Sequence, residues 1–167
     1  MKLSENFDLA EFLPDGVPLR EIPPDIIGNL LELCVRLLQP ARTALGVPLR
    51  VTSGWRLEDN NLAVGGASTS DHLTGRAADL QARASVDRSW EDLTFELFDW
   101  LRTNQAGEFG QLILEDRREF LEDPGKLCVH IALPTIKHPG KDDPSAILVS
   151  SEPRLYRSWT THLEPLA

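Results

Sequence analysis

Two short apolar runs in the C-terminal half constrain the fold of this 167-residue chain more than any other feature. FGQLILE covers residues 109–115 and KLCVHIAL covers residues 126–133, with the charged stretch DRREFLEDPG between them. Because side chains alternate along a strand, Val129 and Ile131 share one face and His130 points to the other. The two runs therefore predict an antiparallel hairpin whose apolar face enters the core and whose second face carries His130.

The same alternation applied to the first run places Leu112 and Leu114 in the core. Glu115 then faces the same side as His130. A carboxylate in that position can act as a general base toward a nearby water. The alternative is that Glu115 forms the solvated end of a strand, because charged residues follow it directly.

The remaining patterns predict helices and further strands. Apolar residues keep helical spacing from Pro24 to Leu45, and Pro40 should kink or divide that helix near the preceding residue. We expect a strand within VPLRVTSGWR that ends at Gly54, and a loop follows it. The other expected elements are a strand at 77–82 and a helix that begins after Ser89 with a capping box. Together they indicate an α+β fold, with a small, mostly antiparallel sheet and helices packed on one side.

The length fits one domain that spans residues 1–167. Within it, residues 1–23 are expected to form an N-terminal capping segment. Residues 134–167 hold five prolines, so we expect an irregular C-terminal tail with one edge strand at 146–149. His138 in this tail is expected on the surface, as is His162.

Composition excludes several classes of partner. The formal charge is -9, which argues against binding to nucleic acid or to an anionic membrane. No apolar run reaches the roughly 20 residues of a membrane span, and the N-terminus lacks the apolar core of a signal peptide. We expect a monomer that is synthesised in the cytoplasm without a signal peptide. Two cysteines, Cys34 and Cys128, do not make a disulfide framework.

The segment STSDHLTGRAADL, residues 68–80, carries the candidate chemistry. His72 and Asp79 stand seven positions apart there, and His130 supplies a third ligand-type side chain. A catalytic zinc site needs about three protein ligands and leaves one position open for water. The alternatives are that the His72–Asp79 spacing arises by chance and that His130 is a structural strand residue.

These residues resemble a known family, the zinc D-alanyl-D-alanine carboxypeptidases and the related phage endolysin peptidases that cleave peptidoglycan peptides. The similar stretches are SENFDLAEF, LLQPARTALGVPLRVTSGWR, NLAVGGASTSDHLTGRAADL, FGQLILE and VHIAL, which cover most of residues 4–133. The family pattern Ser-x-His-x-x-Gly-x-Ala-x-Asp is matched at Ser70, His72, Gly75, Ala77 and Asp79. The resemblance implies the fold of the hedgehog and D,D-peptidase group.

It also implies that His72, Asp79 and His130 bind Zn2+. Arg56 in SGWR looks like the arginine that contacts the substrate or the developing oxyanion, and a guanidinium can engage a carboxylate or carbonyl oxygen with two donors. The alternative for Arg56 is a surface salt bridge. Ser70 is expected to hydrogen-bond the substrate or to orient His72, and the alternative is a plain loop cap.

The chain departs from the family pattern at two positions before the last histidine. Many relatives carry an acidic catalytic base three positions before it, where this chain has Leu127. The most similar branch instead has a glutamate at the end of the preceding strand, which matches Glu115. Tryptophan is common two positions before that histidine, and here the residue is Cys128. We interpret Cys128 as a small residue in the site wall, with a thiolate near zinc as the alternative. Asn61 is expected to tie down the loop before the Gly65-Gly66 turn.

The sequence therefore predicts a zinc metallopeptidase that hydrolyses peptidoglycan stem peptides, as an endopeptidase or a D,D-carboxypeptidase. It would act on the cell wall after release, in phage lysis or as part of a virion. One alternative is a non-catalytic module that binds the wall or builds a virion and keeps zinc for folding. Another is a zinc peptidase for a different substrate, such as a D-amino-acid dipeptide.

Overall fold

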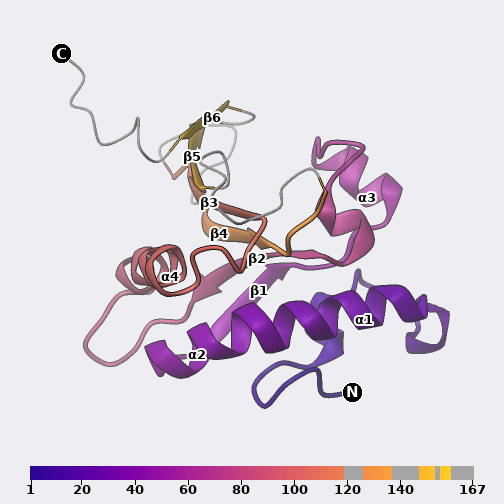
Figure 1. Ribbon diagram of the computed structural model, residues 1–167, viewed down its shortest axis with the longest axis horizontal. Coiled ribbons are helices and arrows are strands. Elements are labelled where there is room, and N and C mark those ends of the chain that lie inside the picture. Colours follow the sequence, from indigo (N-terminus) through magenta and orange to yellow (C-terminus); the bar gives the residue numbers. More distant parts are fainter. Residues whose placement is uncertain (119–125, 137–146, 153–154, 159–167) are drawn as a thin grey trace.

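A six-stranded sheet forms the centre of the molecule, with the strand order β1-β2-β4-β3-β5-β6. Figure 1 shows this computed structural model, which describes residues 1–118, 126–136, 147–152 and 155–158. The strands are β1 (Leu49–Ser53), β2 (Ala77–Ala82), β3 (Gln111–Asp116), β4 (Leu127–Ala132), β5 (Ile147–Glu152) and β6 (Leu155–Ser158). Neighbouring strands run antiparallel except for the parallel pair of β3 and β5. The expected mostly antiparallel sheet is confirmed.

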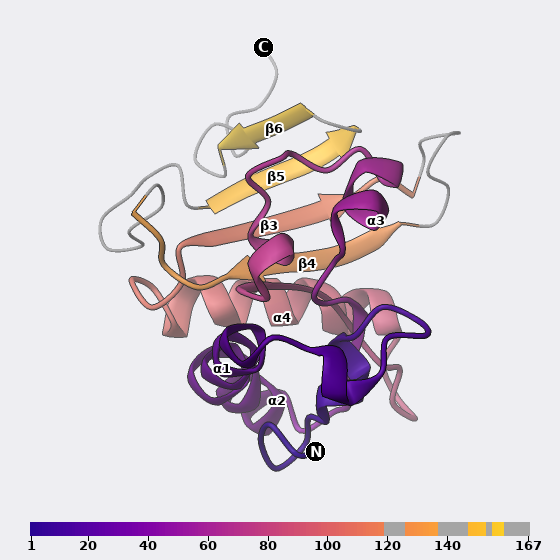
Figure 2. The same ribbon diagram turned by 90° about the vertical axis from the view of Figure 1, so that its right-hand side faces the viewer.

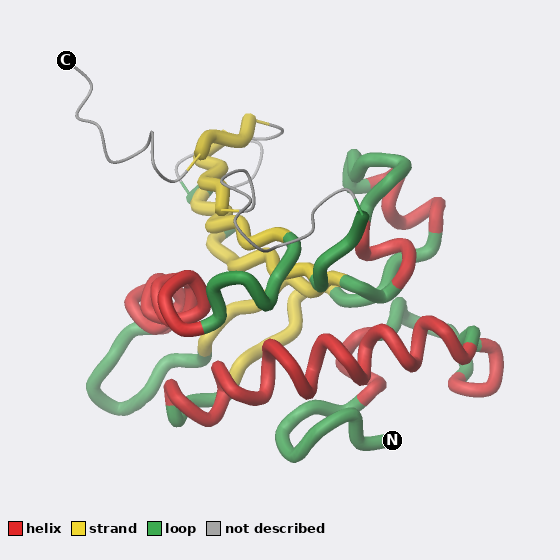
Figure 3. Tube along the Cα trace, viewed as in Figure 1, coloured by secondary structure: helices red, strands yellow, loops and turns green. Residues whose placement is uncertain are grey.

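The longer helices cover one face of this sheet. They are α1 (Pro24–Leu33), α2 (Gln39–Leu45) and α4 (Trp90–Asn104). Figure 3 shows α1 and α2 as one continuous helical rod and α4 as a second rod beside the strands. A short helix that was not expected, α3 (Glu58–Ala63), lies in front of the sheet in Figure 2, on the side away from α1 in Figure 1. The single helical turns are η1 (Leu9–Phe12), η2 (Leu19–Glu21) and η4 (Asp71–Thr74), and η3 (Cys34–Leu38) is a π-helical turn. The α+β class is confirmed.

Alternating side chains divide the sheet into a core face and an open face. Leu112 and Leu114 of β3 join Val129 and Ile131 of β4 in the apolar core beneath the helices. His130 lies on the opposite face, because its neighbours on both sides belong to the core. The predicted β3–β4 hairpin is confirmed.

The helix expected from Pro24 to Leu45 divides where Pro40 requires it. Pro40 has no N–H, so the chain makes one π-helical turn before it, and the N–H of Gln39 donates to the Cys34 carbonyl. The helix then continues as α2 and ends at Gly46, whose φ of 68° is left-handed.

The N-terminal segment packs on the core as expected, whereas the C-terminal region contains more strand than its sequence predicted. Near the N-terminus, Phe7 and Phe12 are each only 1% exposed and belong to the common core. The tail was expected to be irregular with one edge strand at 146–149; it instead contains both β5 and β6. His138 and His162 lie outside the described residues. Across the parts of the chain that the structure describes, no helix has the length and apolarity that crossing a membrane requires.

Candidate metal centre

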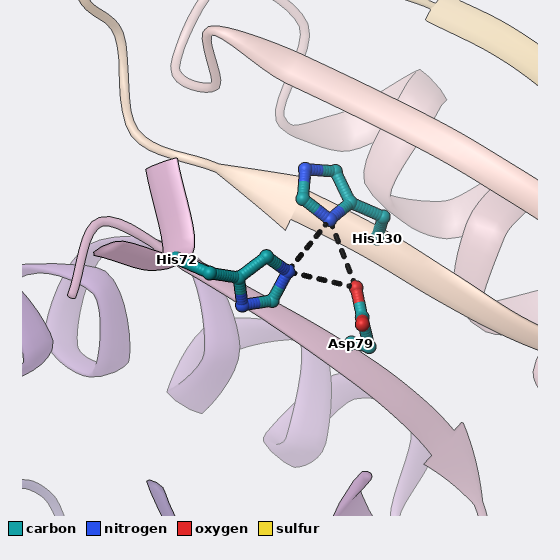
Figure 4. Close-up of side chains that lie close together, drawn as sticks. All are labelled: His72, Asp79 and His130. Carbon is teal, nitrogen blue, oxygen red and sulfur yellow. Dashed lines mark hydrogen bonds and ion pairs between the residues drawn. The ribbon is translucent and has the colours of Figure 1, made fainter. Parts of the chain in front are cut away.

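Three potential metal ligands from separate parts of the chain converge on the open face of the sheet (Figure 4). His72 Nε2 lies 3.2 Å from Asp79 Oδ1 and 3.2 Å from His130 Nδ1. His130 Nδ1 is 2.8 Å from Asp79 Oδ1. Zinc bonds of about 2.0–2.1 Å in a tetrahedron place ligand atoms about 3.3 Å apart. Two nitrogens and one carboxylate oxygen at these separations fit a zinc ion.

Local structure explains why the three side chains meet. Asp79 and His130 are directly opposite each other in the β2–β4 ladder, so their side chains leave the sheet on the same face. His72 comes from η4, which ends at Gly75 with a left-handed φ of 68°. The backbone N–H of Arg56 donates to the His72 carbonyl at 3.0 Å and fixes this turn beside the end of β1.

Two further hydrogen bonds orient the candidate ligands. His72 Nδ1 lies 2.6 Å from the Gly54 carbonyl, and a carbonyl can only accept. Nδ1 therefore carries the proton, and Nε2 keeps its lone pair for the cluster. Arg56 Nη2 donates to Asp79 Oδ2 at 2.6 Å and leaves Oδ1 directed at the two histidines. This is the arrangement by which proteins orient metal ligands from a second layer of contacts.

The charge state of Asp79 suits a ligand. Burial by itself raises the pKa of this carboxyl group, but the electrostatic influence of the His72 and His130 imidazoles, 3.2 and 2.8 Å from Oδ1, outweighs burial. The pKa of Asp79 is therefore held well below its usual value. The side chain is an anion at neutral pH, as metal binding requires.

Comparison with known families places the chain. The model of the family described as Peptidase M15 matches residues 19–114, more than half of the sequence. The chain belongs to the Peptidase M15 family. No curated protein matches it. Among solved structures, the Serratia marcescens L-Ala D-Glu endopeptidase ChiX is similar, with 26% sequence identity and a TM-score of 0.40 over 72% of this chain and 86% of that chain.

In this M15 peptidase, Arg56 makes a contact that the sequence analysis did not foresee. Its side chain is 19% exposed and forms an ion pair with Asp79 rather than with a surface residue. Its Nε also donates to Ser53 Oγ at 2.8 Å. No spacing signal links Arg56 to Asp79, because the contact depends on how β1 and β2 pair. Arg56 is thus positioned to hold a candidate ligand.

Replacing Arg56 with glutamine should weaken zinc binding by about 10- to 100-fold, since the second oxygen of Asp79 would lose its guanidinium partner. Competition against a chromogenic chelator measures this change. Arg36→Gln is the matched control, because that arginine pairs with Glu32 and Glu108 on the surface. Equal zinc affinity in both variants would contradict the orienting role.

Glu115 lies on the open face, as alternation predicts, but outside the three-residue cluster. It is opposite Cys128 in the β3–β4 ladder, two pairs away from the pair of Ile113 and His130. The side chain is 9% exposed, so it is not a solvated strand end. Its Oε2 lies 2.8 Å from Arg117 Nη2 and 2.7 Å from Lys126 Nζ. Arg117 follows Glu115 by two residues, and side chains two apart on a strand share a face. Alternation in the sequence therefore could have predicted this ion pair.

Cys128 fills the wall of the site beside Glu115. Its Sγ donates to Glu115 Oε2 at 3.6 Å. Burial, with the nearby Asp79 and Glu115 carboxylates, raises the pKa of the Cys128 thiol far above its usual value. Cys128 lies outside the cluster of His72, Asp79 and His130, which favours the wall interpretation over a thiolate ligand.

The native protein should react slowly with Ellman's reagent, because Cys34 and Cys128 are 0% and 3% exposed. Burial and then Glu11 raise the pKa of Cys34 to about 12, and thiolate is the reactive form. Two equivalents should react once urea unfolds the chain. Rapid reaction of the native protein would contradict this packing, and the Cys34→Ala variant would then tell which thiol is responsible.

Ser70 and Asn61 have local roles at the edge of the site. Ser70 occupies the N-cap position of η4, where its carbonyl accepts the N–H of Leu73 at 3.0 Å and its hydroxyl makes no capping hydrogen bond. Asn61 Nδ2 donates to the Ala67 carbonyl at 2.9 Å and ties down the loop, as expected. A Cβ at Gly66 would clash with the side-chain amide of Asn61, so a larger residue there would displace Asn61 from the Ala67 carbonyl.

Proposed function

We propose that this M15 peptidase is a zinc-dependent hydrolase of peptidoglycan stem peptides, acting as an endopeptidase or a D,D-carboxypeptidase. The observation that carries the proposal is the cluster of His72 Nε2, Asp79 Oδ1 and His130 Nδ1, all within 3.2 Å of one another. Two imidazoles and one carboxylate form a three-ligand set that leaves a fourth position for water or substrate. The choice of peptidoglycan rests on the matched Ser70–Asp79 motif and its resemblance to wall-cleaving peptidases.

Three residues are proposed to bind the zinc ion, and Arg56 is proposed to orient one of them and to bind the substrate. His72, Asp79 and His130 hold zinc, which when bound acidifies water and polarises the scissile carbonyl. Arg56 keeps Asp79 oriented through one N–H donor and uses a second on Ser53. A guanidinium has five donors, so three remain to bind the substrate or the oxyanion as the tetrahedral intermediate forms.

Glu115 is the proposed general base that takes a proton from the attacking water. Its position on the open face, on the strand next to that of His130, supports this role. Ser70, at the start of η4, is proposed to hydrogen-bond the substrate, because its hydroxyl is not used as a cap.

A second function has its own supporting observation. Glu115 is already engaged by two cations and lies outside the ligand cluster, as expected of a carboxylate that only stabilises the fold. The chain would then be a zinc-stabilised module that binds the wall or builds a virion without turnover. A lack of hydrolysis of every wall peptide tested would favour this non-catalytic function.

Digestion of defined muropeptides tests the proposed function. With zinc present, mass analysis should reveal one cleaved bond, and a chelator should stop the reaction. Intact peptides under both conditions would contradict a peptidoglycan peptidase. Cleavage of only D-amino-acid dipeptides would instead indicate a different substrate.

Glu115→Gln should lower kcat by about 100-fold while zinc remains bound, as loss of a general base does. Asp116→Asn is the matched control, because Asp116 is the next residue and pairs with Arg118 at the surface. Glu115→Gln also removes the ion pairs with Lys126 and Arg117. Thermal unfolding of both variants therefore checks that each one still folds. An unchanged kcat in the Glu115→Gln variant would show that Glu115 is not the general base.

The proposed place of action is the cell wall, reached after release of the protein in phage lysis or as part of a virion. The resemblance to phage endolysin peptidases supports this proposal. Its substrate would be the wall peptide, and a monomer suffices because one chain supplies all three candidate ligands.

A further inference from the structure

Three arginines surround one hollow at the edge of the sheet. Arg42 of α2, Arg50 of β1 and Arg83 just after β2 line a cavity of about 400 Å³ beside the edge strand β1. None of the three makes an ion pair with a carboxylate of the described residues. Glu11 is the acidic residue of the lining, and its Oε1 accepts the N–H of Asp8. In a chain of formal charge -9, unpaired arginines gathered in one hollow indicate an anion site.

Strand alternation places two of these arginines on the same face as the candidate metal centre. Leu49 and Ala82, which are paired, belong to the core. Arg50 follows Leu49 and Arg83 follows Ala82, so both side chains leave the sheet on the open face. The N–H of Arg83 donates to the Pro48 carbonyl at 2.9 Å, so the ladder extends through this position. The open face therefore carries the metal ligands at one end and positive charge at the other.

The distance along the sheet from the candidate metal centre to Arg50 and Arg83 matches the length of a short extended peptide. Arg83 follows Asp79 by four residues along one strand, which corresponds to about 13 Å. Arg50 is paired with Gln81, two residues from Asp79 and thus about 7 Å along the strand. An extended peptide advances about 3.3–3.6 Å per residue. A peptide with its scissile bond at the metal centre would bring a group two to four residues away beside these arginines.

We propose that Arg50 and Arg83 form a subsite that binds a carboxylate of the peptide substrate two to four residues from the scissile bond. Arginine binds carboxylates through paired donors, which gives both affinity and geometric selection. This inference rests on the proposed function for its substrate and adds a specificity for acidic peptides. Arg42 belongs to α2, on the helix-covered side of β1, and contributes positive potential across this edge of the sheet.

Calorimetric binding of two matched ligands tests the subsite directly. The ligands are a defined stem peptide with free carboxylates and the same peptide with its carboxylates amidated. The wild-type protein should bind the acidic peptide roughly tenfold more tightly, as expected of two charge-assisted contacts near the surface. The Arg50→Gln/Arg83→Gln variant should lose that preference and bind both peptides within about twofold.

A charge-matched control separates specific contacts from net charge. Arg20→Gln/Arg102→Gln also removes two positive charges, but these arginines pair with Glu21 and Asp99 on their own helices. The control should keep the tenfold preference. The subsite is wrong if the wild-type protein binds both peptides equally, or if the control loses the preference as well.

Hydrolysis of the same peptides distinguishes this inference from the proposed function. A preference in binding that depends on Arg50 and Arg83 supports the subsite even if neither peptide is cleaved, and the proposed function alone would then fail. Cleavage of both peptides with equal KM in the wild-type protein would keep the function and overturn the subsite.

Discussion

Replacing His72 with alanine should remove bound zinc and lower hydrolysis of wall peptides by at least about 1000-fold. The side chain supplies one of three candidate ligand atoms, and its Nδ1 donates to the Gly54 carbonyl. Without the ion, nothing lowers the pKa of the attacking water toward neutrality, and the scissile carbonyl is not polarised. Zinc content by atomic emission and turbidity loss of a cell-wall suspension measure the two effects.

Glu96→Ala is the matched control for that variant. Glu96 pairs with Arg88 on the surface of α4, and surface pairs contribute little to stability. It should keep both zinc and activity. If the His72→Ala variant still lysed wall material, or retained one equivalent of zinc, the three-ligand account would be contradicted.

Replacing Gly54 with alanine should lower the free energy of unfolding by about 2–4 kcal/mol, through backbone overpacking. A Cβ there would lie 2.5 Å from both Cα and the carbonyl oxygen of Phe12. That carbonyl accepts the Trp55 N–H at 2.8 Å, and Gly54's own carbonyl holds His72. The clash would therefore separate the N-terminal segment from β1 and displace a candidate ligand. Urea unfolding followed by circular dichroism measures the loss.

Gly28→Ala gives the opposite expectation. Gly28 lies inside α1, and apart from its chain neighbours and the backbone of its own helix no atom lies within 4 Å of the position its Cβ would take. Alanine there should raise stability by up to about 1 kcal/mol, because glycine disfavours helix interiors. Equal stability of the Gly54 and Gly28 variants would show that Phe12 does not pack against Gly54 as described.

The strands that build the site follow closely from sequence pattern. Val129 and Ile131 are large and apolar, so alternation alone placed His130 on the open face. The same rule placed Glu115 there. What alternation cannot supply is pairing between distant strands, and the opposition of Asp79 and His130 depends on β2 pairing with β4. Local sequence patterns do not specify which distant strand pairs with β2, or in which register.

The features that the sequence missed depend on tertiary contacts. The Arg56–Asp79 ion pair requires a turn after β1 and an irregularity between Val51 and Ser53. α3 is a six-residue helix of mostly polar sequence, too short for a periodic signal. β5 pairs in parallel with β3 across a long connection within a proline-rich segment, and composition there favoured an irregular tail.

Anomalous X-ray diffraction from crystals grown with zinc tests the central claim most directly. The account predicts one strong zinc peak about 2.0–2.2 Å from His72 Nε2, His130 Nδ1 and Asp79 Oδ1. A zinc peak at any other group of residues, with these three side chains bound to nothing, would contradict it.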